Sequence, residues 1–244
     1  MGAILEVYRR TRKRPDLFWN TWVCRPPAAA LVHLLSGTRV TPNQVTLSAF
    51  VVALAAAALI VLLPGYFGLL AAVVLFELSY VLDCVDGMLA RLRNVQSTPG
   101  HLLDFLMDEI KAFVILGAVA LRLHLERGDA RFLMLGVFGL VCLASGIALT
   151  TFQRRPEIIA VLGGAQTAAG PGGPAYSGPA APTPVQRVVG LVERAAKFLI
   201  HYPSYILYAA IAGRIELYFF PYIAVNAVYA ARAMLWVIVR FGRR

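Results

Sequence analysis

The feature that most constrains this chain is a series of apolar segments, each long enough to cross a lipid bilayer. A spanning helix needs about 20 apolar residues, because the hydrocarbon core is about 30 Å thick. Hydrophobic residues make up 59% of the chain and charged residues 15%, whereas about a quarter of a soluble domain is charged. The sequence therefore predicts an all-α membrane protein. We expect six transmembrane helices, at residues 43–63, 67–90, 100–122, 131–151, 197–212 and 219–239.

Two segments outside these spans differ from them in amino-acid composition. Residues 1–38 mix basic side chains with apolar and aromatic ones, and Pro26 and Pro27 interrupt them. We interpret this segment as an N-terminal interfacial amphipathic helix that lies on the membrane and is broken at the two prolines. In residues 163–184, 17 of 22 residues are Gly, Ala or Pro. This stretch predicts a flexible cytoplasmic linker inside a single membrane domain that covers residues 1–244.

Acidic side chains gather where the second and third predicted spans meet. Asp83 and Asp86 share one face of the second span, and Asp104 and Asp108 lie four residues apart on the third. If these faces meet, four carboxylates converge, and such a cluster in a membrane is costly unless it is paired. Oxygen ligands favour magnesium, manganese or calcium over zinc. The pattern therefore predicts a divalent metal site built from all four aspartates.

Small and basic residues accompany the acids. Gly87 and Ala90 continue the face of the first two aspartates, and Gly100 lies one turn before the third, so a ligand could approach the backbone there. Arg91 suits a phosphate group. Lys111 lies near the stripe of the last two aspartates, where it would balance their charge.

The net charge of +10 sets the expected orientation. Basic residues precede the first predicted span and follow the second, the fourth and the sixth. The positive-inside rule places these ends, both termini and the acidic site in the cytoplasm. We expect a multi-pass protein of a prokaryotic inner or plasma membrane. Its basic excess indicates contact with lipid headgroups and not with nucleic acid.

The spacing of these residues resembles the signature of the CDP-alcohol phosphotransferases. Here it reads Asp83-x2-Asp86-Gly87-x2-Ala90-Arg91-x8-Gly100-x3-Asp104-x3-Asp108, and every fixed position is present. A second, weaker similarity opens the first span, with the run Thr41-Pro42-Asn43-Gln44-Val45-Thr46. The motifs cover roughly residues 25–115, and the six-span layout extends the resemblance over the whole chain.

The resemblance implies an enzyme of phospholipid biosynthesis. Such enzymes transfer a phosphatidyl-type or other substituted phosphoryl group from a CDP-linked donor, here expected to be CDP-diacylglycerol, to an acceptor alcohol and release CMP. It implies two divalent cations, Mg²⁺ or Mn²⁺, on the four aspartates, and Asp108 as the general base. We also expect a homodimer. The residues expected to contact the CDP donor are Gly87, Ala90, Arg91, Gly100, Asn43 and Thr46.

Several alternatives stay open from the residues alone. Arg154, Arg155 and Lys111 are candidates for holding the acceptor, although positive-inside charge explains the two arginines at least as well. Asn43 and Thr46 could instead cap the first span. A cation transporter or channel could use the same aspartates. Metal-dependent binding of a cytidine nucleotide would separate the transferase from the transporter.

Overall fold

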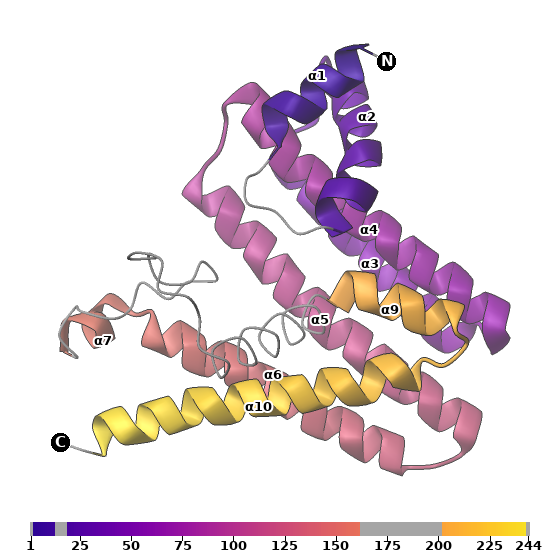
Figure 1. Cartoon of the computed structure of the whole chain (residues 1–244), viewed down its shortest axis with the longest axis vertical. Coiled ribbons are helices and arrows are strands. Elements are labelled where there is room, and N and C mark those ends of the chain that lie inside the picture. Colours follow the sequence, from indigo (N-terminus) through magenta and orange to yellow (C-terminus); the bar gives the residue numbers. More distant parts are fainter. Residues whose placement is uncertain (1, 13–18, 162–201, 243–244) are drawn as a thin grey trace, which may run out of the picture.

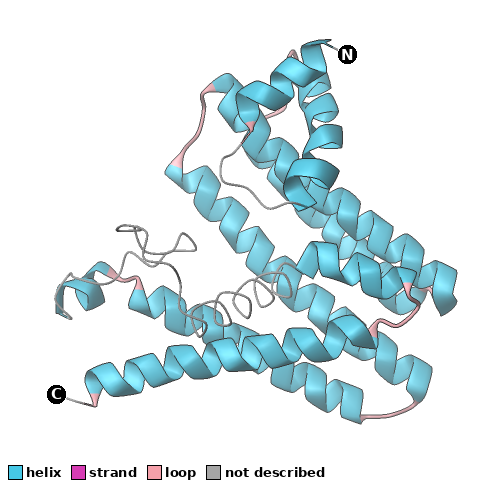
Figure 2. Ribbon diagram, viewed as in Figure 1, coloured by secondary structure: helices cyan, strands magenta, loops and turns pink. Residues whose placement is uncertain are grey.

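The structure is a computed structural model that describes residues 2–12, 19–161 and 202–242. Every regular element in these residues is a helix, as the all-α prediction requires (Figures 1 and 2). In chain order the elements are α1 (Gly2–Thr11), a π-helical turn η1 (Asn20–Cys24), α2 (Arg25–Leu35), α3 (Pro42–Leu62), α4 (Gly65–Arg93), α5 (Thr98–Arg127), α6 (Arg131–Gln153), α7 (Pro156–Val161), α9 (Tyr202–Ile211) and α10 (Glu216–Phe241).

Four of the described helices, α3, α4, α6 and α10, are long and apolar enough to cross a membrane. The expected count of six is therefore not confirmed. The third expected span corresponds to α5, which has 30 residues but carries charged groups toward both ends. The fifth, 197–212, overlaps the ten-residue α9, and its first residues lie outside the described part. The expected linker at 163–184 also lies outside it.

Helices α3 and α4 form an antiparallel hairpin, with Leu63 and Pro64 in the turn between them. Thr41 caps α3: its hydroxyl accepts from the Gln44 N–H, and the Gln44 side chain accepts from the Thr41 N–H. At the other end, Arg122 of α5 is 3% exposed and donates to the carbonyls of Ile60, Leu63 and Gly65. A side chain of α5 therefore fastens the turn between α3 and α4.

The N-terminal interfacial helix that we expected is not confirmed. Pro26 and Pro27 do not break a helix. They lie in the first turn of α2, where a missing N–H leaves no helical bond unmade. Ala28, Ala29 and Val32 of α2 are buried in one cluster with residues of α1, α3 and α4. The segment thus packs against the end of the helical hairpin (Figure 1).

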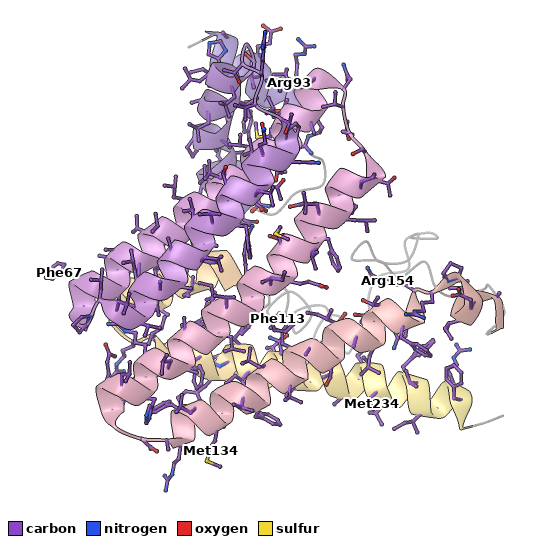
Figure 3. All side chains as sticks on the ribbon, turned by 180° about the vertical axis from the view of Figure 1, so that it is seen from behind. Phe67, Arg93, Phe113, Met134, Arg154 and Met234 are labelled. Atoms are coloured by element: carbon purple, nitrogen blue, oxygen red, sulfur yellow. The ribbon has the colours of Figure 1, made fainter. Side chains whose placement is uncertain are left out.

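Helix α6 packs closely against both α5 and α10. A Cβ at Gly136 would lie 2.4 Å from Ala120 Cβ, and one at Gly139 would lie 2.7 Å from Ile223 Cγ1. These glycines of α6 let it approach both α5 and α10 closely. Figure 3 shows the result from behind, with α5 between α4 and α6 and with Arg154 at the end of α6.

Candidate functional site

A short link positions the two acidic segments. Helix α4 ends before Asn94, whose φ of 56° is the left-handed conformation that asparagine tolerates better than most residues. Ser97 then starts α5, because its hydroxyl accepts from the Gly100 N–H at 3.2 Å. The link between α4 and α5 covers only residues 94–97, so the last turns of α4 and the first turns of α5 lie at the same end of the molecule.

Three of the four predicted metal ligands meet. Carboxylate oxygens of Asp83, Asp104 and Asp108 all lie within 4.8 Å of one another. Helix α5 packs mainly on α3 and α6. The Asp104 and Asp108 side chains of α5 nevertheless meet the Asp83 side chain of α4. Their exposure differs: the Asp108 side chain is 44% exposed, whereas that of Asp83 is 11% exposed.

Asp86, the fourth predicted ligand, lies outside this group of three. It is buried, and its Oδ2 accepts a hydrogen bond of 2.5 Å from the Thr46 hydroxyl of α3. The same hydroxyl lies 3.2 Å from the Pro42 carbonyl in its own helix. Thr46, expected as a donor contact or a cap, thus donates to a signature aspartate.

Lys111 joins the acids of the two helices. Its side chain is 3% exposed, and its Nζ lies 2.6 Å from Asp83 Oδ1 and 3.0 Å from Asp108 Oδ1. A buried ammonium needs such partners, because transfer of a charge out of water is costly. Lys111 therefore compensates the acidic cluster, one of the two roles considered for it. Both contacts hold the Lys111 ammonium in the acidic cluster.

The expected donor contacts surround the same end of α4 and α5. A Cβ at Gly87 would lie 3.4 Å from Arg91 Nη1, so the guanidinium extends over Gly87. A Cβ at Gly100 would lie 3.2 Å from Asn43 Oδ1, which shows that the first turns of α3 and α5 approach closely there. The Ala90 carbonyl accepts from the Val95 N–H in the turn after α4.

Two arginines fasten the N-terminal segment over this end of α4. Arg91 Nε donates to the Thr11 carbonyl of α1 at 2.7 Å. Arg93 donates to the carbonyls of Leu35, Thr38 and Val40 between α2 and α3. In the sequence, Arg93 is one of the basic residues after the second predicted span, and it indicates only the cytoplasmic side. The carbonyl partners of Arg93 are more than 50 residues away in the chain. No local sequence pattern therefore predicts that Arg93 fastens the N-terminal segment.

The acceptor candidates of α6 lie across α5 from α4. Arg154 and Arg155 are exposed at the end of α6. Arg154 is the C-cap residue of α6, and its N–H donates to the Thr150 and Thr151 carbonyls. Gln153 Nε2 donates to the Ala233 carbonyl and ties this end of α6 to α10. Arg154 thus lies at the end of α6, whereas Lys111 lies inside the acidic cluster.

The fold and the site together define a helical membrane protein whose carboxylates converge at one end of two helices. The chain belongs to the CDP-alcohol phosphatidyltransferase family, whose sequence model matches residues 39–241. It is therefore an enzyme of the transferase class, as predicted. Residues of the match include all four aspartates and both ends of the α3–α4 hairpin.

One similar protein is the "Bifunctional IPC transferase and DIPP synthase" of Archaeoglobus fulgidus. It is 32% identical to this chain over 114 residues, which are 47% of this chain and 21% of that protein. The similarity thus spans about a fifth of the archaeal protein's length. It supports the transferase class and leaves the particular substrates to be argued from the site.

Proposed function

We propose that the protein transfers a phosphatidyl or other substituted phosphoryl group from CDP-diacylglycerol to an acceptor alcohol and releases CMP. The observation that carries the proposal is the convergence of Asp83, Asp104 and Asp108 in a chain of this family, with Asp86 outside that group on the same helix as Asp83. The family membership favours this reaction over the cation transporter that the aspartates alone also allowed.

The side chains at the site fit divalent cations. Asp83, Asp104 and Asp108 offer hard oxygen ligands within 4.8 Å of one another, and the ammonium of Lys111 shows that positive charge fits among them. Those three residues and Asp86 would hold two ions. When bound, Mg²⁺ or Mn²⁺ supplies charge neutralisation at the donor pyrophosphate and orients the reacting groups.

Asp108 is the general base in this proposal. Its side chain is 44% exposed and therefore more accessible to a soluble acceptor than Asp83, at 11%. The carboxylate takes the proton from the acceptor hydroxyl as that oxygen attacks the phosphorus bound to the lipid. A new P–O bond forms to the acceptor, and the bond to the CMP oxygen breaks. CMP leaves with the electron pair of that bond.

The remaining side chains bind and orient the two substrates. We propose that Gly87, Ala90 and Gly100 let the nucleotide approach the helices, with Asn43 beside them and Arg91 directed at its phosphates. The position of Arg91 over Gly87 supports this role. Thr46 acts indirectly by holding Asp86.

The acceptor side of the proposal involves the end of α6. Arg154 and Arg155 are exposed there, and we propose that they contact a negatively charged acceptor. The basic residues at this end favour an active site at the cytoplasmic face of a prokaryotic membrane. A homodimer remains part of the proposal by family resemblance alone.

The reaction is tested by CMP release from CDP-diacylglycerol in detergent, with a panel of acceptor alcohols and excess Mg²⁺ or Mn²⁺. We expect release that depends on one acceptor class and stops with EDTA. Asp108→Asn should lower turnover by about 10²–10⁴-fold, the usual cost of losing a general base. Its donor binding in the presence of metal should persist better than that of Asp83→Asn.

Two results would contradict this assignment. The transferase reaction with this donor would be refuted if no acceptor in the panel caused CMP release and nucleotide binding did not depend on metal. If Asp108→Asn loses donor binding as completely as Asp83→Asn, Asp108 serves as a ligand and not as a separate base.

A further inference from the structure

The ammonium of Lys111 occupies the position where a cation would meet two signature aspartates. Its Nζ contacts Oδ1 of Asp83 at 2.6 Å and Oδ1 of Asp108 at 3.0 Å. Those two residues, with Asp104, also form the group whose carboxylate oxygens lie within 4.8 Å. The ammonium and a divalent cation would therefore use the same carboxylates of Asp83 and Asp108.

Physical chemistry gives Lys111 two opposite effects at this place. Without metal, the mutual repulsion of the carboxylates destabilises the end of α4 against α5, and a buried positive charge offsets it. With metal, an oxygen held by a short charged hydrogen bond is less available as a ligand, and two cations in one cluster repel each other. The long, flexible stem of a lysine allows its head group to move.

We propose that Lys111 is a built-in counter-cation of the acidic cluster. In the metal-free protein it holds Asp83 and Asp108 together, and it gives up at least one of these contacts when a divalent cation binds. This inference rests on the metal site of the proposed function. It adds that the affinity for metal is set by competition with a side chain of the enzyme itself.

The proposal predicts that Lys111→Met affects stability and metal affinity in opposite directions. Methionine keeps a long side chain but removes the charge. In EDTA the variant should unfold at a lower temperature than the wild type. Its Kd for Mn²⁺ should fall by roughly tenfold, because a charged hydrogen bond no longer has to be broken. The rise in unfolding temperature on adding Mn²⁺ should therefore exceed that of the wild type.

The experiment uses the full chain in detergent and does not depend on turnover. Binding of Mn²⁺ is followed by loss of the EPR signal of the free ion, and unfolding is followed by heating with EDTA or with Mn²⁺. Arg131→Met is the matched control, since it removes one positive charge at an exposed position at the start of α6. Lys111→Arg keeps the charge and should retain the wild-type affinity within about threefold.

The outcomes separate this inference from the proposed function. An unchanged or weaker Mn²⁺ affinity in Lys111→Met, with binding by the wild type intact, would overturn the competition alone. Absence of Mn²⁺ binding in the wild type and in every variant would overturn the metal site and this inference with it. If Lys111→Met cannot be purified folded, Lys111→Gln replaces it, and the same gain in Mn²⁺ affinity is required.

Discussion

Individual side chains at the site are held by partners on other helices. The Thr46 hydroxyl lies 2.5 Å from Asp86 Oδ2, and both residues are buried. A buried carboxylate that loses such a partner is removed from water without a hydrogen bond to compensate. A hydrogen bond to a charged group contributes about 1.5–3 kcal/mol to stability. Thr46 is therefore a positioning residue for a proposed metal ligand, although its sequence context suggests a helix cap.

We expect Thr46→Val to raise the Mg²⁺ concentration needed for half-maximal CMP release by about 10-fold or more. Valine keeps the branched shape of threonine but cannot donate to Asp86, and the energy lost corresponds to a factor of this size. Thr46→Ser keeps the hydroxyl and serves as the control. A metal titration in which Val and Ser variants coincide would show that Asp86 is oriented without this bond.

Between elements, the site depends on how closely the first turns of α3 and α5 approach. A Cβ at Gly100 would lie 3.1 Å from Ser97 Oγ and 3.2 Å from Asn43 Oδ1, which is tighter than ordinary contact. On the same helix, a Cβ at Gly117 would have no neighbour within 4 Å. The two glycines therefore offer a matched pair that separates local crowding from a general effect on α5.

Gly100→Leu should weaken donor binding by roughly 5- to 100-fold, because overpacking by a side chain costs about 1–3 kcal/mol and would push α5 away from α3. Gly117→Leu should leave donor affinity unchanged. The measurement is binding of a CDP-linked donor in the presence of metal. Equal affinities in the two variants would place the nucleotide away from the start of α5.

At the scale of the whole molecule, the far end of the hairpin is held by one buried cation. Arg122 donates to three carbonyls around the α3–α4 turn and pairs with Glu126 at 2.6 Å. A second ion pair near the same end, Arg127 with Glu216, joins α5 to α10 but is exposed at the arginine. Buried carbonyls that lose their donor stay unsatisfied, whereas an exposed pair contributes little.

Arg122→Met should lower the unfolding temperature in detergent by roughly 5–10 °C, since several buried hydrogen bonds are lost in a chain of this size. Arg127→Met should lower it by no more than about 2 °C. Donor affinity should stay unchanged in both, because the site lies at the opposite end of α4. Thermal unfolding curves that coincide for the two variants would refute the role of Arg122.

Local patterns were enough to predict the helical class and the grouping of the acidic residues. The length of an apolar segment and the helical period depend only on neighbours in the chain, so both follow directly from the sequence. The N-terminal segment was predicted less well. Two adjacent prolines, Pro26 and Pro27, suggest that a helix is broken there. Their effect depends on whether they lie inside a helix or in its first turn, and the structure places them in the first turn of α2.

Only the tertiary structure decided which partners the charged residues have. Lys111 meets Asp83 at a separation of 28 residues, Thr46 meets Asp86 at 40, and Arg91 meets the Thr11 carbonyl at 80. The sequence by itself determined that aspartates would gather at the ends of two helices, because helical spacing is local. It left open that Asp86 would lie apart from the other three and that a lysine would fill the cluster, because those contacts depend on how α3, α4 and α5 pack.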